Sequence, residues 1–176
     1  ILILQILIFM YFCKMIKRLT TLLLLLFVFF IGNSQILINE YSAANYDTYT
    51  DNYGEYEDWV ELYNTSNSAV DISGWFLTDK PSNPTKWMVP SSFIIPAMER
   101  VIIYCSGRDE IIGMDAHTNF KITQTKGNEF LMLSDVGMNV QDSILVLPNQ
   151  KSHTRGRQTD GSPNWSVFTT GTPNST

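Results

Sequence analysis

Beyond residue 35 the chain consists of short apolar or alternating segments separated by Gly, Pro, Asn, Asp and Ser, and this pattern constrains the fold most strongly. Short strands at regular spacing, each bounded by turn-forming residues, are typical of an antiparallel sandwich or barrel. Gly, Pro, Asn and β-branched residues interrupt every long candidate for an amphipathic helix. The sequence therefore predicts an all-β fold with little helix.

The strands are expected where the apolar segments lie. The clear segments are 36–41, 58–64, 74–78, 86–89, 100–105, 130–134, 143–147 and 165–168, and weaker ones lie at 120–122 and 153–157. Alternation is clearest in 58–64, where Trp59, Glu61 and Tyr63 would share one face and Val60 and Leu62 the other. We expect Val60 and Leu62 to face the core.

Two segments are more uniformly apolar than the rest, 100–105 and 143–147. Such segments are expected to be central strands that are covered on both sides. In contrast, Pro81, Pro84 and Pro90 bracket a short strand whose amides cannot all join a ladder. That strand is expected at the edge of a sheet.

Residues 1–34 have the layout of an export signal. Three basic residues, Lys14, Lys17 and Arg18, precede the apolar run 22–31, and Gly32 and Ser34 supply small side chains near a cleavage position at Ser34. The apolar stretch 19–31 would reach about 20 Å as a helix, less than the ~30 Å hydrocarbon layer. We therefore expect secretion or cell-surface exposure after cleavage of this leader, residues 1–34. A membrane-tethered protein is expected only where the leader is retained.

The sequence also indicates where the natural protein starts and how far its domain extends. Met15 followed by the basic and apolar residues forms an ordinary signal by itself, so residues 1–14 are interpreted as upstream sequence. One domain is expected over residues 36–173, and 174–176 are interpreted as the start of a truncated linker with adjoining domains after residue 176.

The charge balance bears on the class of partner. Beyond the leader, nine basic and seventeen acidic residues leave a net charge of −8. Nucleic-acid phosphates require a basic face, so a nucleic-acid partner is not expected. Cys105 has no second cysteine beyond the leader, so no internal disulfide is expected.

The order of motifs resembles the lamin-tail domain family, of the secreted bacterial type. The matching residues are 38–41 (INEY), 58–64 (DWVELYN), 70–79 (VDISGWFLTD), Trp87, Pro90, Cys105, Ser106, 117–121 (HTNFK), 129–135, Gly137, 142–144, Arg157, Asp160, Gly161, Trp165, Thr172 and Pro173. The resemblance implies an immunoglobulin-like β-sandwich of about eight to ten short strands. It implies no catalytic residues, and secreted members of this kind are modules beside other domains.

Two surface-binding candidates stand out. Trp59 beside Tyr63 would form an aromatic platform if Trp59 faced solvent, although aromatic residues are also the usual large fillers of a small sandwich. Arg155 and Arg157 would share one strand face with Lys151 and His153 and form a positive strip. Pairing of that strip with nearby carboxylates is the favoured alternative.

Metal, cofactor and catalytic sites are not expected. The acidic residues Asp47, Asp51, Glu55, Glu57 and Asp58 could supply oxygens to calcium, but Tyr49 and Tyr53 occupy positions that would need oxygen ligands, so a solvated loop is favoured. His117, His153 and Cys105 are too scattered for a zinc signature, and no nucleophile or phosphate-binding motif is present. The expected catalytic residues and cofactors are none.

The functional expectation is a secreted, non-catalytic binding or spacer module of a larger exported or cell-surface protein, with a protein or surface glycan as partner. The alternative is an accessory domain of a secreted enzyme, such as a hydrolase, a nuclease or a kinase-like protein, whose catalytic part follows residue 176. A binding module is expected to expose an apolar or aromatic patch on a sheet face or loop rim.

Overall fold

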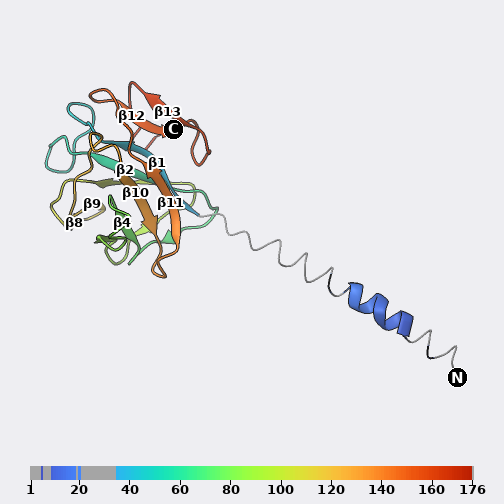
Figure 1. Cartoon of the computed structure of the whole chain (residues 1–176). Helices are drawn as coiled ribbons and strands as arrows, with labels where there is room; N and C mark the ends of the chain where they lie inside the picture. Colours follow the sequence, from blue (N-terminus) through green and yellow to red (C-terminus); the bar gives the residue numbers. More distant parts are fainter. Residues whose placement is uncertain (1–4, 6–8, 19, 21–34, 176) are drawn as a thin grey trace. The chain divides into compact units, whose positions relative to one another are not determined.

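A computed structural model describes residues 5, 9–18, 20 and 35–175 of the chain (Figure 1). The chain divides into two compact units, 1–33 and 34–176. Residues 9–18 of the first unit are helical, whereas the apolar run 22–31 and the expected cleavage position Ser34 lie outside the described residues. None of the helices among the described residues is long and apolar enough to cross a bilayer.

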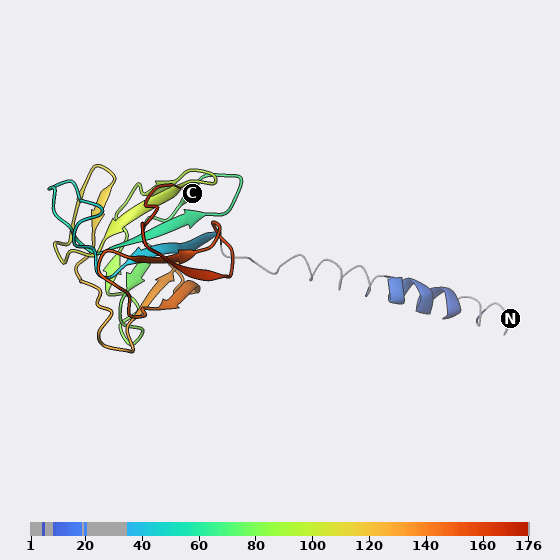
Figure 2. The same cartoon turned by 90° about the horizontal axis from the view of Figure 1, so that it is seen from above.

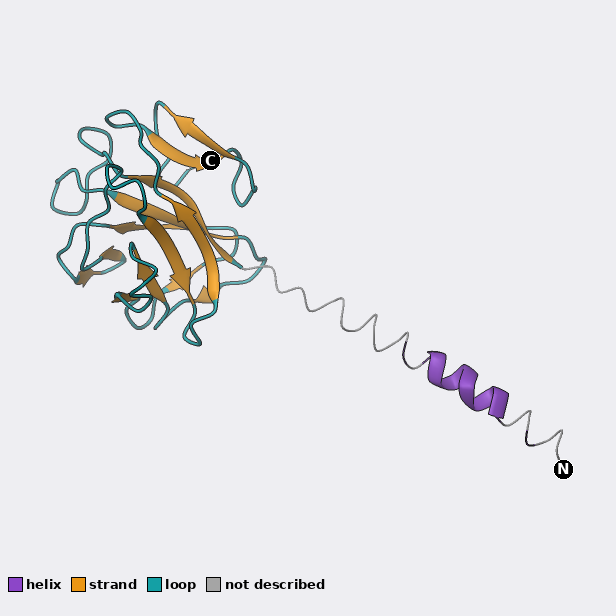
Figure 3. Ribbon diagram, in the orientation of Figure 1, coloured by secondary structure: helices purple, strands orange, loops and turns teal. Residues whose placement is uncertain are grey.

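Residues 35–175 contain only strands and loops (Figure 3). The strands are β1 (Ile36–Ser42), β2 (Trp59–Asn64), β3 (Val70–Asp71), β4 (Phe76–Thr78), β5 (Trp87–Met88), β6 (Ile94–Ile95), β7 (Arg100–Tyr104), β8 (Glu110–Ile112), β9 (Asp115–His117), β10 (Phe130–Ser134), β11 (Val140–Leu145), β12 (Thr154–Arg157) and β13 (Trp165–Phe168). The all-β prediction is confirmed. The weak segment 120–122 forms no strand, whereas the segment 153–157 contains β12.

The strands form a seven-stranded sheet in the order β13-β12-β1-β2-β7-β9-β8, a four-stranded sheet β11-β10-β4-β5 and the pair β3-β6. Figure 2 shows the same strands from above. The pairings are antiparallel except for the parallel pair β7 and β9. Strands from both larger sheets contribute to one core, which is the arrangement of a sandwich.

The core lies between the two larger sheets. The seven-stranded sheet contributes Ile36, Ile38, Val60, Leu62, Val101 and Ile103, and the four-stranded sheet and its flanks contribute Leu77, Trp87, Leu131, Leu133 and Val146. The predicted inward orientation of Val60 and Leu62 is confirmed, because a strand alternates its side chains with a period of two.

The sequence predicts the position within a sheet correctly for two strands and wrongly for a third. Strand β7 lies between β2 and β9, and β5 forms the edge of its sheet, as the sequence predicts. The central position predicted for 143–147 is wrong, because β11 is an edge strand. Its Ile144 packs against the core, but the flanking Val140 and Leu147 are exposed, so only one face of this segment is covered.

A bulge in β1 links the two larger sheets. The register of β1 against β2 shifts between Ile38 and Glu40, which leaves Asn39 as the extra residue. The amide of Ile38 donates to Asp142 Oδ2 at 2.9 Å, and Arg157 Nε donates to the Ile38 carbonyl at 2.8 Å. Arg157 Nη2 also lies 2.7 Å from Asp142 Oδ2, so β12 and β11 are joined by an ion pair at the bulge.

Candidate binding surface

The connection between β1 and β2, residues 43–58, carries four tyrosines and is the candidate binding surface. Tyr46, Tyr53 and Tyr56 are 61%, 49% and 49% exposed. Tyr49 instead packs edge-on against Trp59, with ring centroids 6.0 Å apart. Long loops that present aromatic side chains on a rigid framework are common sites of protein recognition. We call residues 43–58 the tyrosine loop.

Two side chains fix the backbone of the tyrosine loop. Asn45 Nδ2 donates to the carbonyls of Tyr49 and Glu57 at 2.6 and 2.8 Å. Asp51 Oδ1 accepts the amides of Tyr53 and Glu55, each at 2.9 Å. Because short polar side chains replace the missing backbone partners, the loop has a defined shape without strand pairing.

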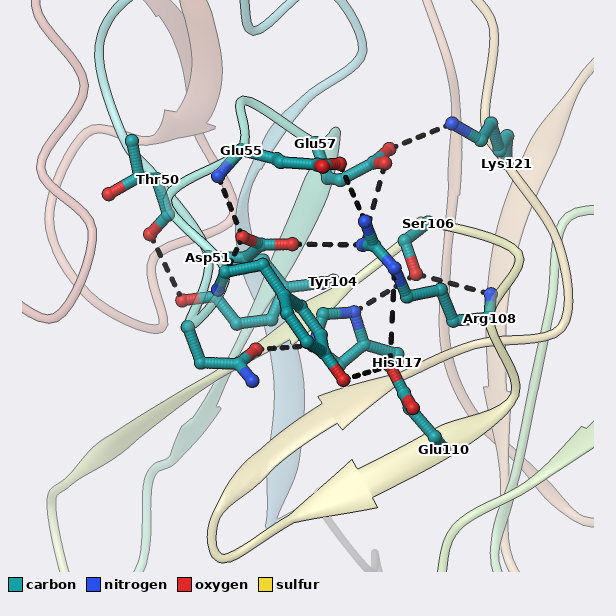
Figure 4. Close-up of polar contacts among 12 residues, drawn as sticks. Thr50, Asp51, Glu55, Glu57, Tyr104, Ser106, Arg108, Glu110, His117 and Lys121 are labelled. Atoms are coloured by element: carbon teal, nitrogen blue, oxygen red, sulfur yellow. Dashed lines mark hydrogen bonds and ion pairs between the residues drawn. The ribbon is translucent and has the colours of Figure 1, made fainter.

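Arg108 holds the loop from the segment that follows β7 (Figure 4). Its guanidinium lies 3.0 Å from Asp51 Oδ2, 2.6 Å from Glu55 Oε2 and 3.6 Å from Glu57 Oε1. It also lies over the ring of Tyr53, 4.7 Å from the centroid. The Asp51 side chain is fully buried, so Arg108 supplies the positive charge that this carboxylate needs.

A buried histidine supports the same loop from the sheet side. His117 stacks on Tyr104 with centroids 5.0 Å apart, and its Nε2 lies 2.7 Å from Asn52 Oδ1. Its Nδ1 lies 2.9 Å from Ser106 Oγ, which also accepts the amide of Arg108 at 3.2 Å. In the neutral tautomer with the proton on Nε2, Nε2 donates to Asn52 and Nδ1 accepts from the Ser106 hydroxyl.

The acidic stretch considered for calcium is divided among other partners. Asp51, Glu55 and Glu57 surround Arg108, while Asp47 pairs with Lys151 at 3.7 Å. Asp58 Oδ1 accepts the Asn45 amide at 3.1 Å, and burial raises the pKa of Asp58 to about 6. Within residues 5, 9–18, 20 and 35–175, no group of three or more His, Cys, Asp or Glu side chains is arranged to hold a metal ion.

The surface candidates chosen from the sequence lie elsewhere. Trp59 is fully buried against Ile102 and Tyr104, so the solvent-facing orientation required for a platform is wrong. The reason is that Tyr49 of the tyrosine loop covers it on the outer side of the sheet. Tyr63 is also buried, and Arg100 lies over its ring at 5.1 Å.

The cations expected to form a positive strip have separate partners as well. Arg157 is held at the β1 bulge by Asp142, and Arg155 Nη2 donates to the carbonyl of Pro148 at 3.0 Å. Lys151 pairs with Asp47. Arg157 and Lys151 thus meet carboxylates, as in the pairing alternative, whereas Arg155 meets a backbone carbonyl.

The tyrosine loop was missed as a site, although a signal was present. Tyr46, Tyr49, Tyr53 and Tyr56 recur every three or four residues among Asn, Asp, Thr and Gly. This composition is typical of recognition loops, where tyrosine supplies rigid contact area and small polar residues adapt their hydrogen bonds.

Removal of the Arg108 guanidinium should loosen the loop while leaving the sandwich folded. We expect Arg108→Met to cost about 1–2 kcal/mol, because the Arg108 side chain is 26% exposed and water can take its place, while Asp51 Oδ1 keeps two amides. Amide hydrogen exchange of residues 43–58 should accelerate at least tenfold. Lys126→Met is the matched control, because it also removes a cation from a buried carboxylate, that of Glu129, but far along the chain from the loop. Unchanged exchange in Arg108→Met would contradict the role assigned to Arg108.

Two facing sheets, a shared apolar core and a structured loop rim define an immunoglobulin-like β-sandwich. The model of the lamin tail domain family matches residues 32–162. The chain belongs to this family, whose members are immunoglobulin-like domains and are generally non-catalytic. No curated protein matches the chain.

Proposed function

We propose that this protein is an exported, non-catalytic binding module and that the tyrosine loop is its binding surface. The observation that carries the proposal is the set of exposed tyrosines on a loop that Asn45, Asp51 and Arg108 hold in one shape. A loop that is ordered before binding loses little conformational entropy when a partner docks. A spacer module would gain nothing from such a surface.

The chemistry of the loop favours a protein partner that carries Lys or Arg side chains. Within the chain, the ring of Tyr53 already faces Arg108 and the ring of Tyr46 faces Lys151, with the cations 4.7 and 5.0 Å from the centroids. The carboxylates of Asp47 and Glu55 pair with Lys151 and Arg108 but are still 60% exposed beside these rings. Aromatic faces and carboxylates together attract cationic side chains through cation–π and ionic contacts.

The proposal is tested with displayed peptides. A random peptide library selected on the full chain should be enriched in Lys- and Arg-containing sequences, and their affinity should fall at least tenfold in Tyr53→Ala or Tyr56→Ala. Phe130→Ala is the control, because Phe130 is partly exposed on β10 of the other sheet. Selected peptides that bind all three variants equally would refute the tyrosine loop as the binding surface.

Export is tested separately by expression of the chain in a bacterial host. We expect the domain in the extracytoplasmic fraction with a new N-terminus near Ser34, because the basic and apolar residues before it form a signal. An uncleaved chain that remains in the cytoplasm would refute export and leave the assignment of the binding surface intact.

A further inference from the structure

The outer face of the seven-stranded sheet buries two neighbouring carboxylates. Glu40 and Glu61 are register partners on β1 and β2, and they are 2% and 0% exposed. Within the described part of the chain, neither forms an ion pair with a Lys, Arg or His side chain. Buried carboxylates without a cation need hydrogen-bond donors.

Asn39 Nδ2 donates to Glu61 and the Thr154 hydroxyl donates to Glu40, and a segment beyond residue 162 supplies further donors to both. The amide of Thr172 lies 3.2 Å from both oxygens of Glu40, and the Thr172 hydroxyl donates to Glu40 Oε2 at 2.8 Å. The amide of Asn174 donates to Glu61 Oε2 at 2.8 Å, and Asn174 Nδ2 lies 3.2 Å from the hydroxyl of Tyr49. We call residues 171–175 the strap.

The strap lines two cavities. Thr172 lines a cavity of about 260 Å³ together with Asn39, Glu40 and Asp160. Asn174 lines a second cavity of about 260 Å³ together with Tyr49, Arg100 and Tyr104. The strap therefore contacts both carboxylates and lines both cavities, and we call the surface beneath it the groove.

We propose that this groove is a binding site for an extended, hydroxyl- or amide-bearing peptide segment, and that the strap is its resident occupant. The two carboxylates recognise backbone amides of alternate residues, here Thr172 and Asn174, and Pro173 between them has no amide to satisfy. Recognition through main-chain donors accepts many sequences, while the flanking cavities select side chains. This site includes Tyr49 of the tyrosine loop but none of the exposed tyrosines Tyr46, Tyr53 and Tyr56.

Gly171 offers a way to empty the groove without changing its walls. A Cβ atom at Gly171 would lie 2.6 Å from Thr154 Cγ2 and 3.1 Å from Glu40 Oε1. Both neighbours are buried, so they have little room to move. Gly171→Leu should therefore release the strap, whereas Thr170→Leu should not, because Thr170 is exposed.

The test uses the full chain and a labelled peptide with the sequence of residues 168–175. We expect the peptide to bind Gly171→Leu at least tenfold more tightly than wild type or Thr170→Leu, because a tethered strap competes at ~mM effective concentration. Adding Glu61→Gln to Gly171→Leu should weaken binding at least tenfold. Tyr56→Ala should leave it unchanged, which separates this site from the proposed function.

Hydrogen exchange of residues 169–175 provides the second measurement. It should accelerate in Gly171→Leu and also in Asn174→Pro, which removes the amide bound to Glu61 without adding bulk at Gly171. Peptide binding that is equal in wild type and Gly171→Leu would overturn the proposal. So would a strap that stays protected in both variants, or a released strap with no peptide binding.

Discussion

Arg157→Met is expected to destabilise the domain by about 3–5 kcal/mol, the range found when one partner of a buried ion pair is removed. The side chains of Arg157 and Asp142 are only 9% and 15% exposed. The substitution also leaves the carbonyls of Ile38 and Ser162 without their guanidinium donor. Urea unfolding followed by tryptophan fluorescence measures the loss as a lower midpoint with an unchanged slope.

Arg155→Met is the matched control for this prediction. It lies two residues earlier on β12, but its bond to the Pro148 carbonyl is exposed, so its removal should cost less than about 1 kcal/mol. Combining Arg157→Met with Asp142→Leu should recover part of the lost stability, because no unpaired carboxylate then remains buried. A loss below 1 kcal/mol in Arg157→Met would show that the bulge does not depend on this ion pair.

The fold was predictable where the sequence pattern that determines it is local. In β2 a period of two assigns Val60 and Leu62 to the core and Trp59 to the opposite face, because the pleat alternates side chains. The short strands β3 and β6 have only two residues each, too few to show any period. Their pairing depends on neighbours distant in sequence, which a local pattern does not contain.

The site was less predictable, because its contacts are not local. The sequence placed Trp59 on the correct face but not beneath Tyr49, since cover by a loop is decided in three dimensions. Arg108 and Asp51 lie 57 residues apart in the sequence, and they meet only after β7 and the tyrosine loop fold together. The sequence shows the charges but not which carboxylate each cation meets.

The domain is expected to be more stable at mildly acidic pH than at neutral pH. Burial raises the pKa of Glu61 from 4.5 to about 7, although the bonds from Asn39 and Asn174 oppose the shift. Between these two values the folded protein holds a proton that the unfolded chain has released. The free energy of unfolding therefore falls as pH rises through this window, by about 3 kcal/mol from this group, and levels off above pH 7.

Asp58 adds a contribution of the same sign at lower pH. Burial raises its pKa from 3.8 to about 6, so its part of the stability is lost as pH rises from about 4 to 6. Hydrogen bonds lower the pKa of exposed Asp71 and of half-buried Asp135. The stability that these two groups contribute is lost only when pH falls below about 4. The two buried carboxyls therefore dominate the pH dependence between pH 4.5 and 7.

Denaturant unfolding at pH 4.5, 5.5, 6.5 and 7.5 tests this expectation, and Glu61→Gln and Asp58→Asn assign it to residues. Glu61→Gln removes the titrating group. The free energy of unfolding of this variant should therefore change little above pH 6, whatever its magnitude. Asp58→Asn should keep the decline between pH 6 and 7 and lose part of the decline below pH 6. An identical slope in wild type and Glu61→Gln between pH 6 and 7 would show that Glu61 is already ionised there, because a carboxyl that keeps its ordinary pKa binds no proton in this range.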